Sequence, residues 1–111
     1  MNYLHDVTIL LSPAAFTRMD DVARDVLKAF FKFQVLDDLW ILARGGNVPS
    51  DRDKELVKWL DTLDYDRGEV YEVLAMGSCY EEVEHYSNKI GQDRLSVGRA
   101  ACLDGDRIII V

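Results

Sequence analysis

The segment SPAAFTRMDDVARDVLKAFFKF, residues 12–33, contains the strongest secondary-structure pattern in the chain. Ser12 is a residue type that caps helices, and Pro13 suits the first helical position because its missing N–H would be unbonded there anyway. Beyond Pro13, apolar side chains recur at alternating spacings of three and four residues, which is typical of an amphipathic helix. The apolar positions are Phe16, Met19, Ala23, Val26, Phe30 and Phe33. We therefore predict one helix from Ala14 to about Phe31.

The large aromatic residues of this helix require a broad apolar surface to cover them. A β-sheet formed by the rest of the chain offers such a surface, so we expect the helix to lie across a sheet. The chain has 111 residues, which is the usual size of a single domain, and we assign residues 1–111 to one α/β domain. Apolar residues make up 49%, which is enough for a core without disulfides or a structural metal.

Charge and cysteine content narrow the function classes. The chain contains 13 basic and 20 acidic residues, for a net charge of −7. A nucleic-acid-binding protein normally has the opposite sign, so we expect no direct nucleic-acid binding and favour a basic protein partner. Cys79 and Cys102 are too few for a disulfide framework and have no zinc spacing, and we predict no metal or cofactor. The first residues lack the basic region of a signal peptide and no apolar run could span a membrane, so we expect a cytoplasmic protein.

Four strands and a hairpin turn are predicted from alternating or continuous apolar runs. The strands are predicted at Tyr3–Leu11, Val70–Met76, Leu95–Leu103 and Arg107–Val111, and Asp104-Gly105 is a typical two-residue hairpin turn between the last two. Residues 31–43 fit two alternatives. One is a hairpin with strands near 33–36 and 39–44, and the other is a single buried strand from Leu39 to Ala43. The sequence alone does not separate them.

Two more helices are predicted from capping patterns. Ser50, with Asp53 three residues later, approximates a capping box before the stripe Leu56, Val57, Leu60 and Leu63. Ser78 and Glu81 form a second capping box, which predicts a short third helix over about 79–90. The complete prediction is an α/β (α+β) fold with a mixed sheet of about five strands and three helices, in the order β-α-β-α-β-α-β-β.

Two glycine-containing segments are candidate ligand-binding loops. Residues 44–47, Arg-Gly-Gly-Asn, and residues 77–79, Gly-Ser-Cys, each lie between a predicted strand and a predicted helix. Glycine lets the backbone approach a ligand, and a helix N-terminus attracts anions and lowers the pKa of a thiol such as Cys79. A nucleophilic cysteine also needs a base, and no histidine is placed to act as one. The simpler interpretation is a pair of turns, so a small enzyme or ligand-binding domain is the alternative function.

Acidic residues are concentrated between residues 61 and 84, where tyrosines are interleaved with them. Carboxylates can steer a basic partner and tyrosine rings can anchor it, so we predict a partner-binding surface here. The competing interpretation is a solvated acidic face with tyrosines partly in the core. The predicted binding residues are Asp61, Asp64, Tyr65, Asp66, Glu69, Glu72, Tyr80, Glu81, Glu82 and Glu84.

In composition alone, a compact acidic chain without a catalytic constellation resembles small inhibitor proteins. Immunity proteins that neutralise nuclease toxins and phage anti-defence proteins such as anti-CRISPRs share this character. The resemblance implies an inhibitor that occupies a basic, nucleic-acid-binding surface of a partner protein, and not an enzyme. Composition does not establish function, and a homodimer or structural subunit is a third interpretation.

Overall fold

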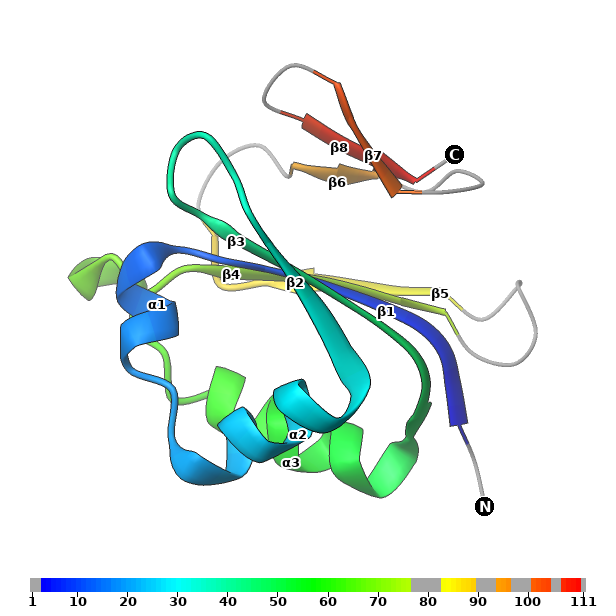
Figure 1. The fold of residues 1–111 in the computed structure, drawn as a ribbon. Helices are drawn as coiled ribbons and strands as arrows, with labels where there is room; N and C mark the ends of the chain where they lie inside the picture. The colour runs from blue at the N-terminus through cyan, green and yellow to red at the C-terminus, as the bar shows by residue number, and fades with distance from the viewer. Residues whose placement is uncertain (1–2, 77–82, 90–93, 97–100, 105–106, 111) are drawn as a thin grey trace.

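The computed structural model shows a five-stranded antiparallel sheet with the helices on one face (Figure 1). It describes residues 3–76, 83–89, 94–96, 101–104 and 107–110. The strands of the main sheet are arranged in the order β2-β3-β1-β4-β5. Their bounds are β1 Tyr3–Leu11, β2 Phe31–Val35, β3 Ile41–Pro49, β4 Tyr71–Met76 and β5 Val83–Ser87. The first strand of the chain is therefore the central strand of the sheet, and its prediction is confirmed.

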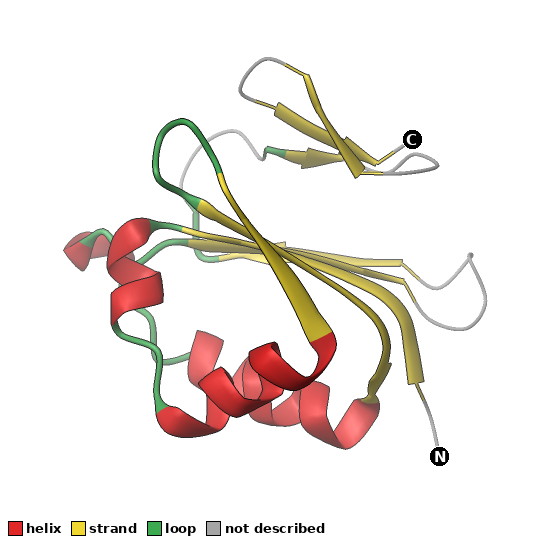
Figure 2. Ribbon diagram, viewed as in Figure 1, coloured by secondary structure: helices red, strands yellow, loops and turns green. Residues whose placement is uncertain are grey.

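Helices α2, Asp21–Phe30, and α3, Ser50–Leu60, pack against the same face of the sheet (Figure 2). A five-residue helix, α1 Pro13–Thr17, and a short 3-10 helix, η1 Tyr65–Arg67, complete the helical elements of the described residues. Alternate residues of the strands point toward α2 and α3 and form the larger core with them. This core includes Val7, Ile9, Leu11, Val26, Leu27, Leu56, Leu60 and Val73. The α/β class with five strands in one sheet and three α-helices is confirmed.

The predicted single helix over 14–31 is wrong, because Arg18–Asp20 interrupt it. Asp20 caps the second helix, since its side chain accepts a hydrogen bond from the N–H of Ala23 at 2.8 Å. The break rotates α1 relative to α2, so the apolar stripe does not continue. Phe16 is 38% exposed, and it contacts the ring of Phe33, which is 44% exposed, at a centroid distance of 6.2 Å.

Ser12 caps α1 as predicted and also fixes a distant turn. Its Oγ accepts hydrogen bonds from the N–H of Ala15 at 3.3 Å and of Val70 at 2.9 Å, and donates to the carbonyl of Gly68 at 2.7 Å. Ser12 is buried, so these bonds are shielded from water. One side chain therefore joins the end of β1, the start of α1 and the segment that leads into β4.

Residues 31–43 form a hairpin, which confirms the first of the two alternatives. Leu39 occupies the turn with a φ of 70°, and the N–H of Leu36 donates to the carbonyl of Trp40 at 2.8 Å. The loop predicted at residues 44–47 is wrong, because β3 continues to Pro49. Gly45 is needed there for space: a Cβ atom would lie 2.8 Å from the carbonyl oxygen of Phe30.

The predicted third helix over about 79–90 is wrong where the structure describes it, because residues 83–87 form β5. Tyr86 lies opposite Val73 of β4, and His85 lies opposite Leu74. A spacing of three residues between Val83 and Tyr86 suggested a helix, but pairing with β4 outweighs this weak local pattern. The capping residues proposed for this helix lie outside the described residues.

A second, three-stranded sheet lies over the face of the main sheet that carries no helix (Figure 1). It contains β6 Leu95–Ser96, β7 Ala101–Asp104 and β8 Arg107–Ile110, in the order β6-β8-β7. The antiparallel β7–β8 pair agrees with the predicted hairpin, whereas the parallel β6–β8 pair was not foreseen. A smaller core lies on this side, made by Leu10, Leu36, Leu42, Leu74, Met76 and Leu95.

Candidate protein-binding surface

The acidic residues predicted to bind a partner fall into three groups. Asp61, Asp64, Asp66 and Glu84 are exposed, and Tyr65 is half-buried. Glu69 and Glu72 are buried, so their side chains are not part of an exposed acidic face. Tyr80, Glu81 and Glu82 lie outside the described residues.

Glu69 holds two segments of the chain together. Its Oε1 accepts a hydrogen bond from the N–H of Asp64 at 3.0 Å and forms an ion pair with Arg18. Arg18 also donates to the carbonyl of Thr62 at 2.8 Å. The Asp64 N–H and the Arg18 guanidinium lower the pKa of Glu69, because both favour the charged carboxylate. This carboxylate therefore has a structural role at the end of α1.

Glu72 is fully buried on the opposite face of the sheet, where it contacts the segment that leads into β6. One oxygen accepts from the N–H of Arg94 at 2.8 Å, and the other accepts from the N–H of Leu95 at 2.9 Å. The ring of His85 lies 2.7 Å from the second oxygen, and the ammonium group of Lys89 lies 3.8 Å from the first. A buried carboxylate requires such partners, so Glu72 links β4 to the second sheet.

One part of the exposed negative charge lies along the edge formed by α3 and β5. Asp53 of α3 is half-buried, and its pKa is raised to about 6 by burial and by the nearby charge of Glu84. Glu84 is exposed on β5. The charge of Glu84 disfavours ionisation of Asp53, which indicates that the two carboxyl groups lie near each other at this edge.

Two tyrosines of β4 and β5 lie beside these carboxylates. The rings of Tyr71 and Tyr86 are in edge-to-face contact, with centroids 6.3 Å apart. Burial raises the pKa of Tyr86 above its ordinary range, and the charges of Asp53, Glu84 and Asp61 add to this effect. Burial and Asp61 also raise the pKa of Tyr71. We call the surface made by Asp53, Asp61, Glu84 and Tyr86, together with the buried Tyr71 that packs against Tyr86, the α3–β5 edge.

The carboxylates of the α3–β5 edge lack the ion pairs that most other described acidic side chains form. Among the described residues, no ion pair joins Asp53, Asp61 or Glu84 to a basic side chain. Elsewhere, Arg44 pairs with Asp6 at 3.5 Å, and Arg94 pairs with Asp38 at 2.9 Å. The described residues also contain no group of three or more His, Cys, Asp or Glu side chains that could hold a metal ion. The arrangement is suited to attracting a cationic surface.

The sequence indicated part of this surface and missed the rest. Asp61 and Glu84 were among the predicted binding residues. Asp53 was interpreted as a capping residue, but the N-cap of α3 is Pro49 and no side chain caps that helix. The pairing of Tyr71 with Tyr86 depends on β5, which the sequence suggested was helical. In a strand, Glu84 and Tyr86 lie on one face and His85 and Ser87 on the other. This period of two is the local sequence signal that could have indicated a strand here.

The fold does not contain the loop at residues 44–47 that the alternative ligand-binding site required. Residues 44–47 belong to β3, and residues 77–79 lie outside the described part of the chain. Arg44, Gly45 and Gly46 do line an open groove of about 480 Å³ on the side of the sheet away from the helices.

No family model, curated protein or solved structure matches this chain. Within the described residues, none of the helices has the length and apolar content required to cross a membrane.

Proposed function

We propose that the protein is a small acidic inhibitor that binds a basic surface of a partner protein through the α3–β5 edge. The observation that supports this most strongly is the set of carboxylates at Asp53, Asp61 and Glu84, which have no basic partner among the described residues. Burial and the charge of Glu84 raise the pKa of Asp53, and a lysine or arginine from a partner would offset this effect by favouring the charged carboxylate. Binding would then release a proton near pH 6.

The tyrosines of the α3–β5 edge give the surface a means of anchoring a partner. Tyr86 is half-buried and lies against Tyr71, so one ring is fixed by another before binding. A ring that is already ordered loses little conformational freedom on association. Tyrosine is also enriched at protein interfaces, because it combines a large apolar area with a polar group.

A basic surface that binds nucleic acid is the natural target of such an edge. The protein would compete for the lysines and arginines that contact phosphates, and its net charge of −7 would accelerate the encounter. This is the mode of action expected of an immunity-protein-like or anti-CRISPR-like inhibitor. Direct binding to nucleic acid is not expected.

A charge-reversal pair tests the proposal. The double variant Asp61→Lys/Glu84→Lys reverses the edge, and Asp25→Lys/Asp37→Lys reverses two other exposed acids with the same change in net charge. Tagged proteins would be incubated with lysate from the native host, and the retained partner would be identified and mapped by cross-linking. We expect the edge variant to lose the partner, or to associate about tenfold more slowly, while the control retains it.

Salt dependence gives a second readout with the isolated partner. Association of the wild-type protein should slow as salt rises toward about 0.5 M, because screening shortens the range of the field. If the edge variant associates at the wild-type rate, with cross-links elsewhere, the α3–β5 edge is only a solvated acidic surface.

A further inference from the structure

The opposite edge of the main sheet is formed by β2, which has no strand on its outer side among the described residues. The N–H of Leu36 donates to the carbonyl of Trp40, the residue just before β3, and bonded positions alternate along an antiparallel pair. The backbone N–H and C=O groups of Phe33 and Val35 therefore point outward. These groups could pair with a further strand without any change to the existing sheet.

The side chains of β2 are unusually apolar for an open edge. Phe33 is 44% exposed and Val35 is 62% exposed. Natural proteins usually blunt such edges with charge, and here Lys32 is the one charged residue of the strand. An apolar edge strand with free backbone groups is the arrangement that proteins use to bind an extended peptide.

A groove lies beside β2 on the helix side of the sheet. Phe16, Met19 and Phe33 form its apolar lining, and Arg24 and Lys28 from α2 lie at its margin. The groove has a volume of about 320 Å³, which is enough for one or two apolar side chains. Alternate residues of an added strand would point toward it.

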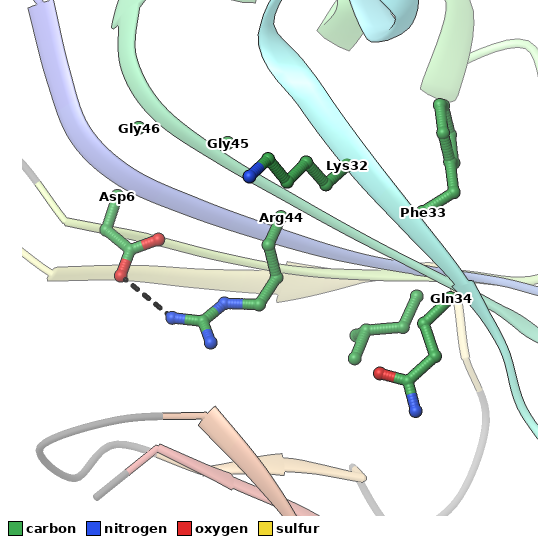
Figure 3. Close-up of a pocket in the computed structure, with 8 residues that line it drawn as sticks. Asp6, Lys32, Phe33, Gln34, Arg44, Gly45 and Gly46 are labelled. Carbon is green, nitrogen blue, oxygen red and sulfur yellow. Dashed lines mark hydrogen bonds and ion pairs between the residues drawn. The ribbon is translucent and has the colours of Figure 1, made fainter.

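The second groove lies on the other side of the same strand, and its lining includes the charged residues Asp6, Lys32 and Arg44 (Figure 3). Figure 3 shows Arg44 and Gln34 on the side of the sheet opposite to Phe33. Lys32 also lines this groove, and Arg44 reaches Asp6 at 3.5 Å. The intervening residues of an added strand would point toward these basic groups.

We propose that a segment of a partner protein adds to β2 as a sixth strand, with carboxylates on one face and apolar side chains on the other. The apolar face would fill the helix-side groove, and the carboxylates would meet Lys32 and Arg44. Among the described residues, no ion pair involves Lys32, so its ammonium group remains available to an acidic segment. This concentration of basic residues contrasts with the net charge of −7.

The same charges disfavour a second copy of this chain as the occupant. Two β2 strands placed edge to edge would bring Lys32 and Arg44 of both copies to one face, and Lys28 of both copies to the other. Like charges on neighbouring strands are destabilising, and β2 supplies no carboxylate to offset them. A partner segment with alternating glutamates resolves this repulsion.

The probe for this site is a labelled seven-residue peptide with glutamate at the odd positions and leucine or valine at the even positions. A control peptide has the same composition, with the glutamates grouped at one end. Fluorescence polarisation should show binding of the alternating peptide at least about fivefold tighter than binding of the grouped one, because only alternation separates the two faces. Equal affinity, or no binding of the alternating peptide at millimolar concentration, would overturn the proposal.

Variants distinguish strand addition from simple charge attraction. Val35→Pro removes one outward N–H, and Val35→Thr retains it, so only the proline variant should lose affinity. Lys32→Glu should weaken binding, whereas Lys54→Glu, on the exposed side of α3, should not. Circular dichroism and thermal melting establish that each variant is folded.

Amide hydrogen exchange provides a readout that does not depend on any variant. Peptide binding should slow exchange at Phe33 and Val35, whose N–H groups point outward, and leave Lys32 and Gln34 little changed, since these already bond to β3. Protection confined to other parts of the chain would place the peptide elsewhere and refute the proposal. Sedimentation should show a monomer with one peptide bound, and a peptide-independent dimer through β2 would also contradict it.

Discussion

The carboxylate of Glu72 and the ring of His85 lie 2.7 Å apart, on neighbouring strands of the main sheet. Glu72 is fully buried, and its carboxylate also accepts hydrogen bonds from the backbone N–H groups of Arg94 and Leu95. The pair therefore lies where the main sheet contacts residues 94–95, at the start of the second sheet. The sequence placed Glu72 on an exposed acidic face and His85 on a helix, and the structure corrects both assignments.

Removal of the Glu72 carboxylate should destabilise the protein strongly. In Glu72→Ala, two buried N–H groups lose their acceptors, so we expect the free energy of unfolding to fall by about 3 kcal/mol. Glu72→Gln keeps one oxygen acceptor and should lose less. Glu84→Ala, on the adjacent strand but exposed, is the control and should change stability by under about 0.5 kcal/mol. Urea denaturation measures all three, and an equal effect of Glu72→Ala and Glu84→Ala would contradict the assigned role.

The raised pKa of Asp53 predicts a specific pH dependence. The ordinary pKa is 3.8 and the value in the fold is about 6, so the native state binds more protons than the unfolded state between these values. Stability should therefore fall as pH rises through this window. Asp53→Asn should raise the free energy of unfolding by about 1 kcal/mol at pH 7.5, after allowance for solvent screening, and have little effect at pH 3.5.

Asp51→Asn is the matched control for this prediction. Asp51 lies in the same first turn of α3 but is exposed, so its replacement tests the contribution of the helix dipole alone. We expect a change of only a few tenths of a kcal/mol for Asp51→Asn. If the two variants show the same stability at every pH, then Asp53 is not perturbed in the way described.

Gly45 should not tolerate even a methyl group. The added Cβ of Gly45→Ala would lie 2.8 Å from the carbonyl oxygen of Phe30 and 3.0 Å from the ring of Phe31. Because backbone is the nearest obstacle, we expect a loss of about 2 kcal/mol. Gly46→Ala, one residue later and exposed, should cost under about 1 kcal/mol. Thermal melting compares them, and an unchanged midpoint for Gly45→Ala would refute the close approach.

The apolar stripe of the first helical segment should divide into core and surface positions. Leu27 is fully buried, so Leu27→Ala should cost about 3 kcal/mol. Phe30 is only partly buried against the core, so the loss for Phe30→Ala should be smaller, about 2 kcal/mol. Phe33→Ala should cost under about 1 kcal/mol, because the ring is 44% exposed. Chemical denaturation would contradict this order if Phe33→Ala were the most destabilising of the three.

The parts of the fold that follow from local patterns were predictable from the sequence. The alternation in Tyr3–Leu11 defines β1, and the Ser12-Pro13 pair marks the start of α1. By contrast, β5 depends on pairing with β4, and short segments are decided by such distant contacts more than by propensity. The loop predicted at Gly45-Gly46 failed for a similar reason, because both glycines lie in β3 and Gly45 permits close packing against Phe30 and Phe31.

For the candidate surface, the sequence predicted only that its charge is negative. Counting charges between residues 61 and 84 shows an acidic region, but the count cannot show that Glu69 pairs with Arg18 or that Glu72 faces the second sheet. Asp53 approaches Glu84 only because α3 lies beside β5, and no local pattern relates a helix residue to a strand thirty residues away.

The central position of β1 has a consequence for how the chain is made. β1 emerges from the ribosome before the other strands of the main sheet, and its neighbour β3 can pair with it as soon as the β2–β3 hairpin is complete. Its other neighbour, β4, is translated only after α3 and η1, which takes roughly 1–5 seconds at roughly 5–20 residues per second. During that interval the nascent chain exposes the unpaired edge of β1 beside Ile9 and Leu10, and a chaperone has its best opportunity to engage the chain there.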